Sequence, residues 1–258
     1  MVRRTARQAY RATGFIALTA AMLPVFLAHY NKVPASQKET VRDLWVRRWA
    51  RALLALFSVT VEVTGASVPP PTRKGDRGRL IVANHRSTID VGVLLGTFGG
   101  VMVSRDDLAR WPVIGAAARA VGTVFVDRKN AESGAATIRA IQKHLEEGAT
   151  IILFPEGTTF DGDEVRPFFG GAFIAAARAG AEVLPVGLAY PKSSGAAFLD
   201  ETFPQHLARM AKSGATRMAL AIGTPIDVAK GSRAGPLAKR AHDDVAALVL
   251  RARTICGA

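Results

Sequence analysis

Two residues that could do chemistry together, His85 and Asp90, lie five positions apart where an apolar run ends in RLIVANHRSTID, residues 79–90. Within one helix their side chains would point about 140° apart, so they meet only if His85 lies in the turn before a helix and Asp90 lies in its first turn. The carboxylate would then bond one ring nitrogen and fix the tautomer, leaving the other nitrogen to take a proton from a substrate hydroxyl. The pair therefore predicts general-base catalysis.

Both residues also fit a purely structural role. Residues 87–90, Ser-Thr-Ile-Asp, have the S-x-x-D form of a capping box, so Asp90 could merely cap a helix and His85 could merely be a polar turn residue. The sequence contains no G-x-S-x-G motif, which argues against a serine nucleophile of the hydrolase kind. If the histidine is a base, we therefore expect a hydroxyl of the substrate to be the nucleophile.

A second cluster of polar residues follows the apolar run of TIILFPEGTTFDG, residues 150–162. Glu156 supplies a carboxylate, Gly157 an adaptable backbone, and Thr158 and Thr159 two hydroxyls. An ordinary turn is the alternative interpretation, because proline and glycine both favour one. By itself this segment does not decide between a turn and a site.

Taken together, the two segments resemble the lysophospholipid acyltransferase family, typified by 1-acylglycerol-3-phosphate acyltransferases. The family's N-H-x4-D hallmark corresponds to NHRSTID here, and its F-P-E-G-T block corresponds to FPEGT about 70 residues later. Its block that ends in a phosphate-contacting arginine corresponds to GTVFVDR, which ends at Arg128, and its V-x-P-V-like strand corresponds to VLPV at 183–186. The segment 106–115 is similar to the family's link between the first two blocks, so the resemblance runs from about residue 78 to 190.

The resemblance implies a mechanism that agrees with the chemistry of the residues. His85 would act as general base on the hydroxyl of a lysolipid, Asp90 would orient it, and the hydroxyl would attack the thioester of acyl-CoA or acyl carrier protein. These carriers are co-substrates, and no further cofactor and no metal is expected. Backbone N–H groups near a helix start or around Gly157 are the expected oxyanion donors. The residues expected to bind substrate are Asn84, Arg86, Arg128, Glu156, Gly157, Thr158 and Thr159.

The favoured acceptor is 1-acylglycerol-3-phosphate, which would give phosphatidic acid, but two positions depart from that pattern. Many phosphatidic-acid-forming members continue their F-P-E-G-T block with arginine, where this chain has Thr159. Many also carry a lysine or arginine where this chain has Phe169 and Gly170. Another lysolipid, such as a lyso-ornithine lipid or a lysophosphodiester, is therefore the alternative acceptor. A lipid-binding protein without catalysis is a further alternative, although it would not need an intact His85 and Asp90.

Elements that could position these residues follow from the apolar pattern. Strand-like runs alternate with helix-like segments, which predicts an α/β domain with a mainly parallel sheet flanked by helices. In such sheets, sites collect at the carboxyl ends of the strands. The expected strands are 80–84, 101–104, 123–127, 150–154, 182–190 and 217–223, and the expected helices are 131–147, 168–179 and 234–251.

The N-terminal part differs from this body in charge and hydropathy. Residues 1–51 hold ten Lys or Arg against Glu39 and Asp43, which gives +8 of the chain's net +13. An uncharged stretch of 15 residues, 14–28, falls short of the roughly 20 needed to span a bilayer comfortably, and a second apolar stretch occupies 52–63. We expect residues 1–64 to form a membrane-associated helical segment and residues 65–258 to form the acyltransferase domain. A cleaved signal peptide is the alternative, but no small-x-small cleavage site precedes Tyr30.

The charge and the cysteine content bear on partners and location. An anionic membrane surface suits a basic segment that is also apolar, whereas a nucleic-acid partner is not expected, since only 7% of residues are aromatic. The single cysteine, Cys256, excludes an intramolecular disulfide and suits a reducing compartment. We therefore expect a cell-membrane protein with its catalytic domain on the cytoplasmic face. The remaining histidines, interpreted as surface or packing residues, are His29, His144, His206 and His242.

Overall fold

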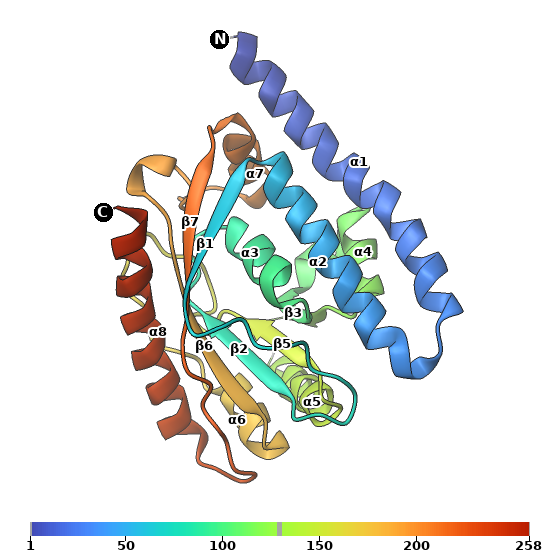
Figure 1. The fold of residues 1–258 in the computed structure, drawn as a ribbon, viewed down its shortest axis with the longest axis vertical. Coiled ribbons are helices and arrows are strands. Elements are labelled where there is room, and N and C mark those ends of the chain that lie inside the picture. The colour runs from blue at the N-terminus through green and yellow to red at the C-terminus, as the bar shows by residue number, and fades with distance from the viewer. Residues whose placement is uncertain (1, 128–130, 258) are drawn as a thin grey trace.

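A seven-stranded sheet forms the centre of the computed structural model, which describes residues 2–127 and 131–257 (Figure 1). The strand order is β1-β7-β6-β2-β5-β3-β4, and neighbours are parallel except for β6 and β7. The predicted fold class, a mainly parallel sheet flanked by helices, is therefore confirmed. The strands are β1 (Val59–Gly65), β2 (Arg79–Ala83), β3 (Val101–Arg105), β4 (Val124–Val126), β5 (Thr150–Leu153), β6 (Glu182–Ala189) and β7 (Thr216–Ile222). The α-helices are α1 (Val2–Lys32), α2 (Lys38–Leu56), α3 (Ile89–Phe98), α4 (Ile114–Ala120), α5 (Ala131–Glu146), α6 (Gly171–Ala179), α7 (Phe203–Lys212) and α8 (Ala234–Cys256).

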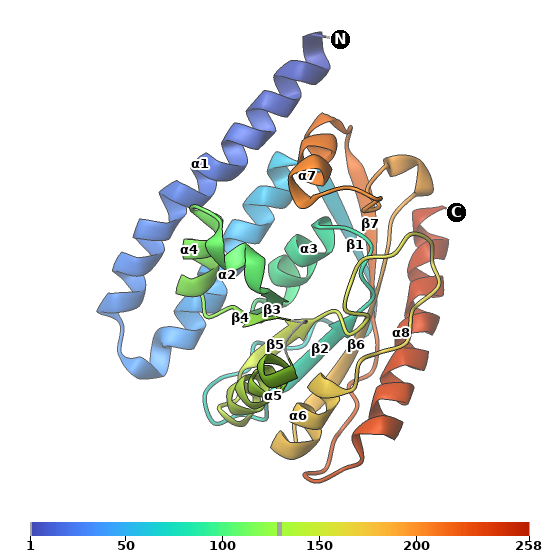
Figure 2. The same ribbon diagram turned by 180° about the vertical axis from the view of Figure 1, so that it is seen from behind.

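Helices cover both faces of the sheet, which explains why its central strands are apolar along their whole length. Leu80 and Val82 of β2 pack in one core cluster with residues of α5, α6 and α8. Ile81 and Ala83, which point to the opposite face, pack in a second cluster with residues of α2 and α3. Figure 2 shows α8 on one side of the sheet and α2 with α3 on the other. A strand buried on both faces has no polar alternation, so the continuous apolar runs were a valid signal.

The second apolar stretch of the N-terminal segment contains a strand, which corrects the expectation that residues 1–64 are helical. Helix α2 ends at Leu56, and residues Val59–Gly65 form β1, the edge strand that pairs in parallel with β7. The alternation V-T-V-E-V-T suits a strand with one buried side, and Ser58, with φ of 55°, breaks the helix just before it. The last residues of the predicted membrane segment therefore belong to the sheet.

Helix α1 is longer than the 15-residue apolar stretch suggested. It is one continuous helix of 31 residues, and the part Thr5–Lys32 is long and apolar enough to cross a membrane by length and composition. It packs against α2 and α7 (Figure 1). Arg11 fastens it to the body, donating to the Leu56 carbonyl at 3.0 Å and to the Ser213 carbonyl at 2.7 Å. The helical hairpin of α1 and α2 is thus attached to the α/β body through specific polar contacts.

Candidate active site

The turn between β2 and α3 holds the histidine and the aspartate as the sequence predicted. His85 lies in the turn, Asp90 lies in the first turn of α3, and His85 Nδ1 is 3.0 Å from Asp90 Oδ2. The same carboxylate oxygen accepts from the backbone N–H groups of Arg86 at 2.7 Å and Ser87 at 2.8 Å. The geometry fits both interpretations, because one carboxylate organises the turn before the helix and also contacts the imidazole.

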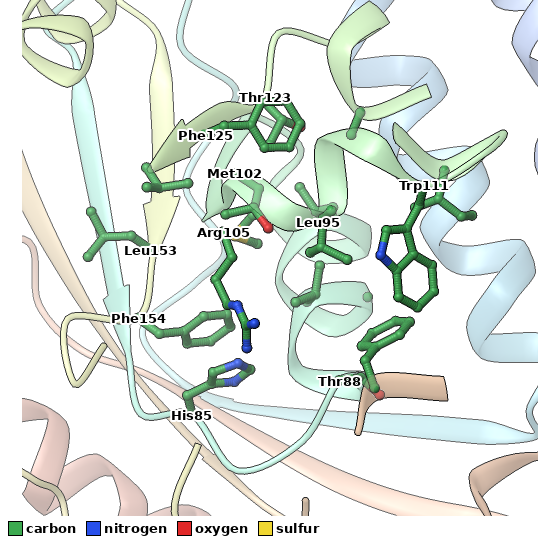
Figure 3. A pocket seen from close by; sticks show the side chains of 18 of the residues that line it. His85, Thr88, Leu95, Met102, Arg105, Trp111, Thr123, Phe125, Leu153 and Phe154 are labelled. Atoms are coloured by element: carbon green, nitrogen blue, oxygen red, sulfur yellow. The ribbon is translucent and has the colours of Figure 1, made fainter. Parts of the chain in front are cut away.

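The imidazole of His85 is held by a carboxylate and an aromatic ring and is partly exposed. Asp90 bonds Nδ1 from a fully buried position, whereas 18% of the His85 side chain is exposed. The ring stacks on Phe154 with centroids 3.8 Å apart and planes 7° from parallel. His85 lines a cavity, and Figure 3 shows its ring at the cavity wall beside Phe154. With Nδ1 engaged by the carboxylate, Nε2 is the nitrogen available to a substrate proton.

Arg86 and Glu156 form a buried ion pair that joins the two motifs. Arg86 Nη1 is 2.9 Å from Glu156 Oε2, and Glu156 Oε1 accepts from the backbone N–H of His85 at 3.0 Å. Arg86 also donates to the carbonyls of Gly162, at 2.7 Å, and Glu164. Their side chains are 5% and 0% exposed, and neither lines the cavity. Their burial and pairing suit a positioning role, since buried charges need partners of this kind. Substrate binding by these two residues stays a prediction.

Asn84 likewise holds the fold together instead of facing a substrate. Its amide donates to the Leu188 carbonyl at 3.0 Å and accepts from the Leu188 N–H at 2.8 Å. The buried side chain thus extends the pairing of β2 with β6 beyond the last strand residue, Ala83. Both polar atoms of Asn84 bond to the backbone of Leu188, so this geometry indicates a structural role, and substrate binding by Asn84 stays a prediction.

The loop after β5 places its remaining predicted residues on the cavity wall. Gly157, Thr158 and Thr159 all line the cavity. Gly157 has φ of 81°, and a Cβ there would come within 2.5 Å of the Phe169 ring, so only glycine fits without rearrangement. The predicted anion-binding residue Arg128 lies outside the described residues.

An apolar cavity of about 1270 Å³ extends from His85 between the sheet and the helices α1 to α4. Its size and lining suit a long hydrocarbon chain, for which each buried methylene contributes about 0.8 kcal/mol. Figure 3 shows Leu95, Met102, Phe125 and Trp111 around this space. Other apolar residues of the lining, drawn from the N-terminal hairpin, are Phe15, Met22, Leu23, Phe26, Trp49, Leu53 and Leu54.

A second histidine contacts the turn between His85 and Asp90 from the protein interior, which the sequence pattern did not indicate. His206 is fully buried, and its Nδ1 is 2.8 Å from Glu201 Oε1 while its Nε2 is 3.4 Å from Ser87 Oγ. Burial lowers the pKa of the His206 imidazole, which therefore stays neutral near pH 7. The signal that could have revealed it is the spacing of Glu201 and His206, which is five positions, the same as between His85 and Asp90.

Known proteins share both the sequence pattern and the fold. A model of the acyltransferase family matches residues 60–189, just over half of the chain. A lyso-ornithine lipid O-acyltransferase of Pseudomonas aeruginosa is 27% identical over 91% of this chain and 89% of its own length. A 1-acyl-sn-glycerol-3-phosphate acyltransferase of Neisseria meningitidis is 30% identical over 63% of this chain and 60% of its own length. The crystal structure of the 1-acyl-sn-glycerophosphate acyltransferase of Thermotoga maritima has the same fold, with a TM-score of 0.74 at 20% identity, covering 100% of this chain and 98% of that one.

Proposed function

Because this chain belongs to the acyltransferase family, among the lysophospholipid acyltransferases, we propose that it transfers a fatty acyl group from acyl-CoA or acyl carrier protein to the free hydroxyl of a lysolipid. The observation that carries the proposal is the position of the His85–Asp90 pair at the wall of a long apolar cavity. Such a cavity holds an acyl chain next to the base and keeps water from competing with the lipid hydroxyl.

Each step of the transfer has a group that can serve it. His85 Nε2 takes the proton of the acceptor hydroxyl, whose oxygen forms a bond to the thioester carbonyl carbon. Collapse of the tetrahedral intermediate breaks the carbon–sulfur bond, and the thiolate takes the proton back from the imidazolium. Asp90, whose side chain is buried against the ring, stabilises the imidazolium between these steps.

The oxyanion of that intermediate needs backbone donors near His85. The N–H of Gly157 bonds to the Phe154 carbonyl at 3.1 Å, so this group is already engaged. The next two residues, Thr158 and Thr159, line the cavity and supply the N–H groups we assign to the oxyanion.

A panel assay tests the proposed reaction. Purified protein in detergent is incubated with several lysolipids and with both acyl donors, and the products are read by mass spectrometry. We expect acyl transfer to at least one lysolipid at a rate above thioester hydrolysis. Hydrolysis alone, or no consumption of either thioester, would contradict the proposal.

Two acceptors are candidates, and different observations favour each. 1-Acylglycerol-3-phosphate is the substrate class named for the Neisseria meningitidis relative. A lyso-ornithine lipid is the class named for the Pseudomonas aeruginosa relative, whose alignment covers more of both chains. The uncharged Thr159 and Phe169 on the cavity wall favour the second candidate, because a phosphate monoester needs cations around it.

Adding the missing cation should improve the use of the phosphate-bearing acceptor. Thr159 lines the cavity, so an arginine there can reach a head group held near His85. We expect Thr159→Arg to raise kcat/KM for 1-acylglycerol-3-phosphate by about tenfold, the effect of one charge-assisted hydrogen bond. Thr159→Gln, of similar reach but uncharged, is the control. An equal gain for both variants would show that charge is not what limits this acceptor.

We further propose that the α1–α2 hairpin docks the enzyme on an anionic membrane, with the catalytic domain on the cytoplasmic face of the cell membrane. Large apolar side chains on α1 are exposed, which is costly unless a lipid phase covers them. The surrounding basic residues each contribute roughly 1 kcal/mol near an anionic surface. The exposed apolar residues of α1 are Tyr10, Ile16, Val25 and Leu27.

Charging these exposed apolar side chains of α1 should release the protein from vesicles. Deleting residues 1–64 would remove β1 and α2 from the core, so point changes on α1 are the cleaner test. The triple variant Ile16→Glu, Val25→Glu and Leu27→Glu should weaken flotation with anionic vesicles at least about tenfold, since each side chain loses its apolar burial. Val68→Glu, at an exposed apolar position of the linker, is the matched control. Unchanged flotation of a folded triple variant would argue against docking through α1.

A further inference from the structure

Two described residues on the cavity wall near His85 are uncharged where a phosphate head group would favour cations. Thr159 and Phe169 occupy positions where many phosphatidic-acid-forming members of the family carry basic residues, and both line the cavity. Phe169 packs over Gly157, so an apolar ring takes the place of a charge directly beside the motif loop. We therefore expect other residues of this chain to bind the head group of the acceptor.

Arg105 is the one arginine or lysine among the described residues that line the cavity. Three described carboxylate residues also line the cavity, namely Asp107, Asp127 and Glu201. Glu201 is occupied by His206 and Arg209, whereas Asp107 pairs with Arg105 on the cavity wall.

The geometry of this pair makes both members available to a ligand. Asp107 accepts from Arg105 Nε at 3.1 Å and from Nη2 at 2.9 Å, and the side chains are 65% and 47% exposed. An exposed pair of this kind contributes little to stability, so a ligand can replace it at small cost. Figure 3 shows the Arg105 guanidinium extending toward His85 and Phe154, which places the pair on the catalytic side of the cavity.

We propose that Arg105 and Asp107 form a subsite for a zwitterionic amino-acid head group on the lysolipid acceptor. Its carboxylate bonds the guanidinium fork of Arg105, and its ammonium group bonds Asp107. A phosphate monoester would gain the arginine but face the aspartate, so the pair selects against it. The inference rests on the proposed function, because it assigns the head group of that same acceptor.

Two acceptors and one substitution test the subsite. Initial rates are measured for a lysolipid with an ornithine head group and for 1-acylglycerol-3-phosphate of equal acyl length. We expect Asp107→Asn to lower kcat/KM for the ornithine lysolipid by about tenfold and to leave unchanged or raise that for 1-acylglycerol-3-phosphate. An ornithine lysolipid with its side-chain amine acetylated lacks the ammonium, so the substitution should not change its kcat/KM.

The adjacent acid provides a matched control. Asp106 pairs with Arg110 at 3.0 Å and does not line the cavity, so Asp106→Asn should not alter the preference between acceptors. An equal loss for both acceptors in Asp107→Asn, or no loss for the ornithine lysolipid, would overturn the subsite. Wild-type protein that acylates only 1-acylglycerol-3-phosphate would also overturn it while leaving the proposed function intact. Wild-type protein that acylates no lysolipid would overturn the proposed function itself.

Discussion

His85→Ala should lower kcat by roughly 10²–10⁴-fold, the range that general bases contribute elsewhere. The variant removes the nitrogen that takes the hydroxyl proton while leaving the cavity that holds the acyl chain in place. The KM for both substrates should therefore change much less than kcat. Steady-state rates with acceptor and donor varied separately would measure the two effects. Near-normal turnover by folded His85→Ala would show that another group is the base.

Asp90 bonds the His85 ring, and replacing it with asparagine removes its charge while keeping its shape. Asp90→Asn keeps an oxygen that can accept the hydrogen bonds from Arg86 and Ser87. The turn should therefore persist, but the imidazolium loses its counter-charge, so kcat should fall substantially while remaining above that of His85→Ala. Thermal unfolding of both variants checks that the loss is chemical, because neither should unfold far below the wild-type protein.

Glu156→Ala should have the largest effect on stability, lowering the free energy of unfolding by roughly 3–5 kcal/mol, as expected when one partner of a buried ion pair is removed. Arg86 would keep its charge in a site where its side chain is only 5% exposed, and the His85 N–H would lose its acceptor. Denaturant unfolding in detergent measures the change.

Substituting an exposed pair gives the contrast for this result. Asp106→Ala breaks the ion pair with Arg110, whose side chain is 79% exposed, and should change stability by about 1 kcal/mol or less. A Glu156→Ala variant as stable as Asp106→Ala would mean that Arg86 finds another partner or reaches water. The activity of Glu156→Ala should also fall, because the same carboxylate holds the backbone of the catalytic turn.

The sequence predicted those parts of the site that depend on local pattern. The apolar runs marked β2 and β5 to within a residue, and the spacing of His85 and Asp90 required the turn that the structure contains. The same reasoning grouped Arg86 and Glu156 with the substrate-binding residues, because their mutual contact joins positions 70 apart in the chain. Sequence pattern gives the type of a residue, whereas its partner is decided by packing.

Strand β1 and the contact made by His206 could not be predicted for the same reason, because both depend on residues far apart in the chain. Strand β1 was hidden in an apolar stretch because its partner, β7, lies near the other end of the chain. His206 was interpreted as a surface or packing residue, because nothing local shows that its ring reaches Ser87 across 119 positions. In both cases the local composition was compatible with several structures, and tertiary contacts selected one.

The pairing of β1 with β7 also imposes an order on synthesis. The pairing partner of Val59 is Thr216, which is synthesised 157 positions later (216 − 59). At common translation rates this interval lasts on the order of ten seconds. During that interval α1 and α2 have left the ribosome, while β1 presents an unpaired edge of the kind that recruits other chains. Because β7 enters between β1 and β6, the sheet closes only when the C-terminal part arrives. A nascent chain that stalls between β6 and β7 would therefore leave β1 unpaired and the β6 edge of the sheet open, and we expect such chains to depend most on chaperones or on early membrane contact.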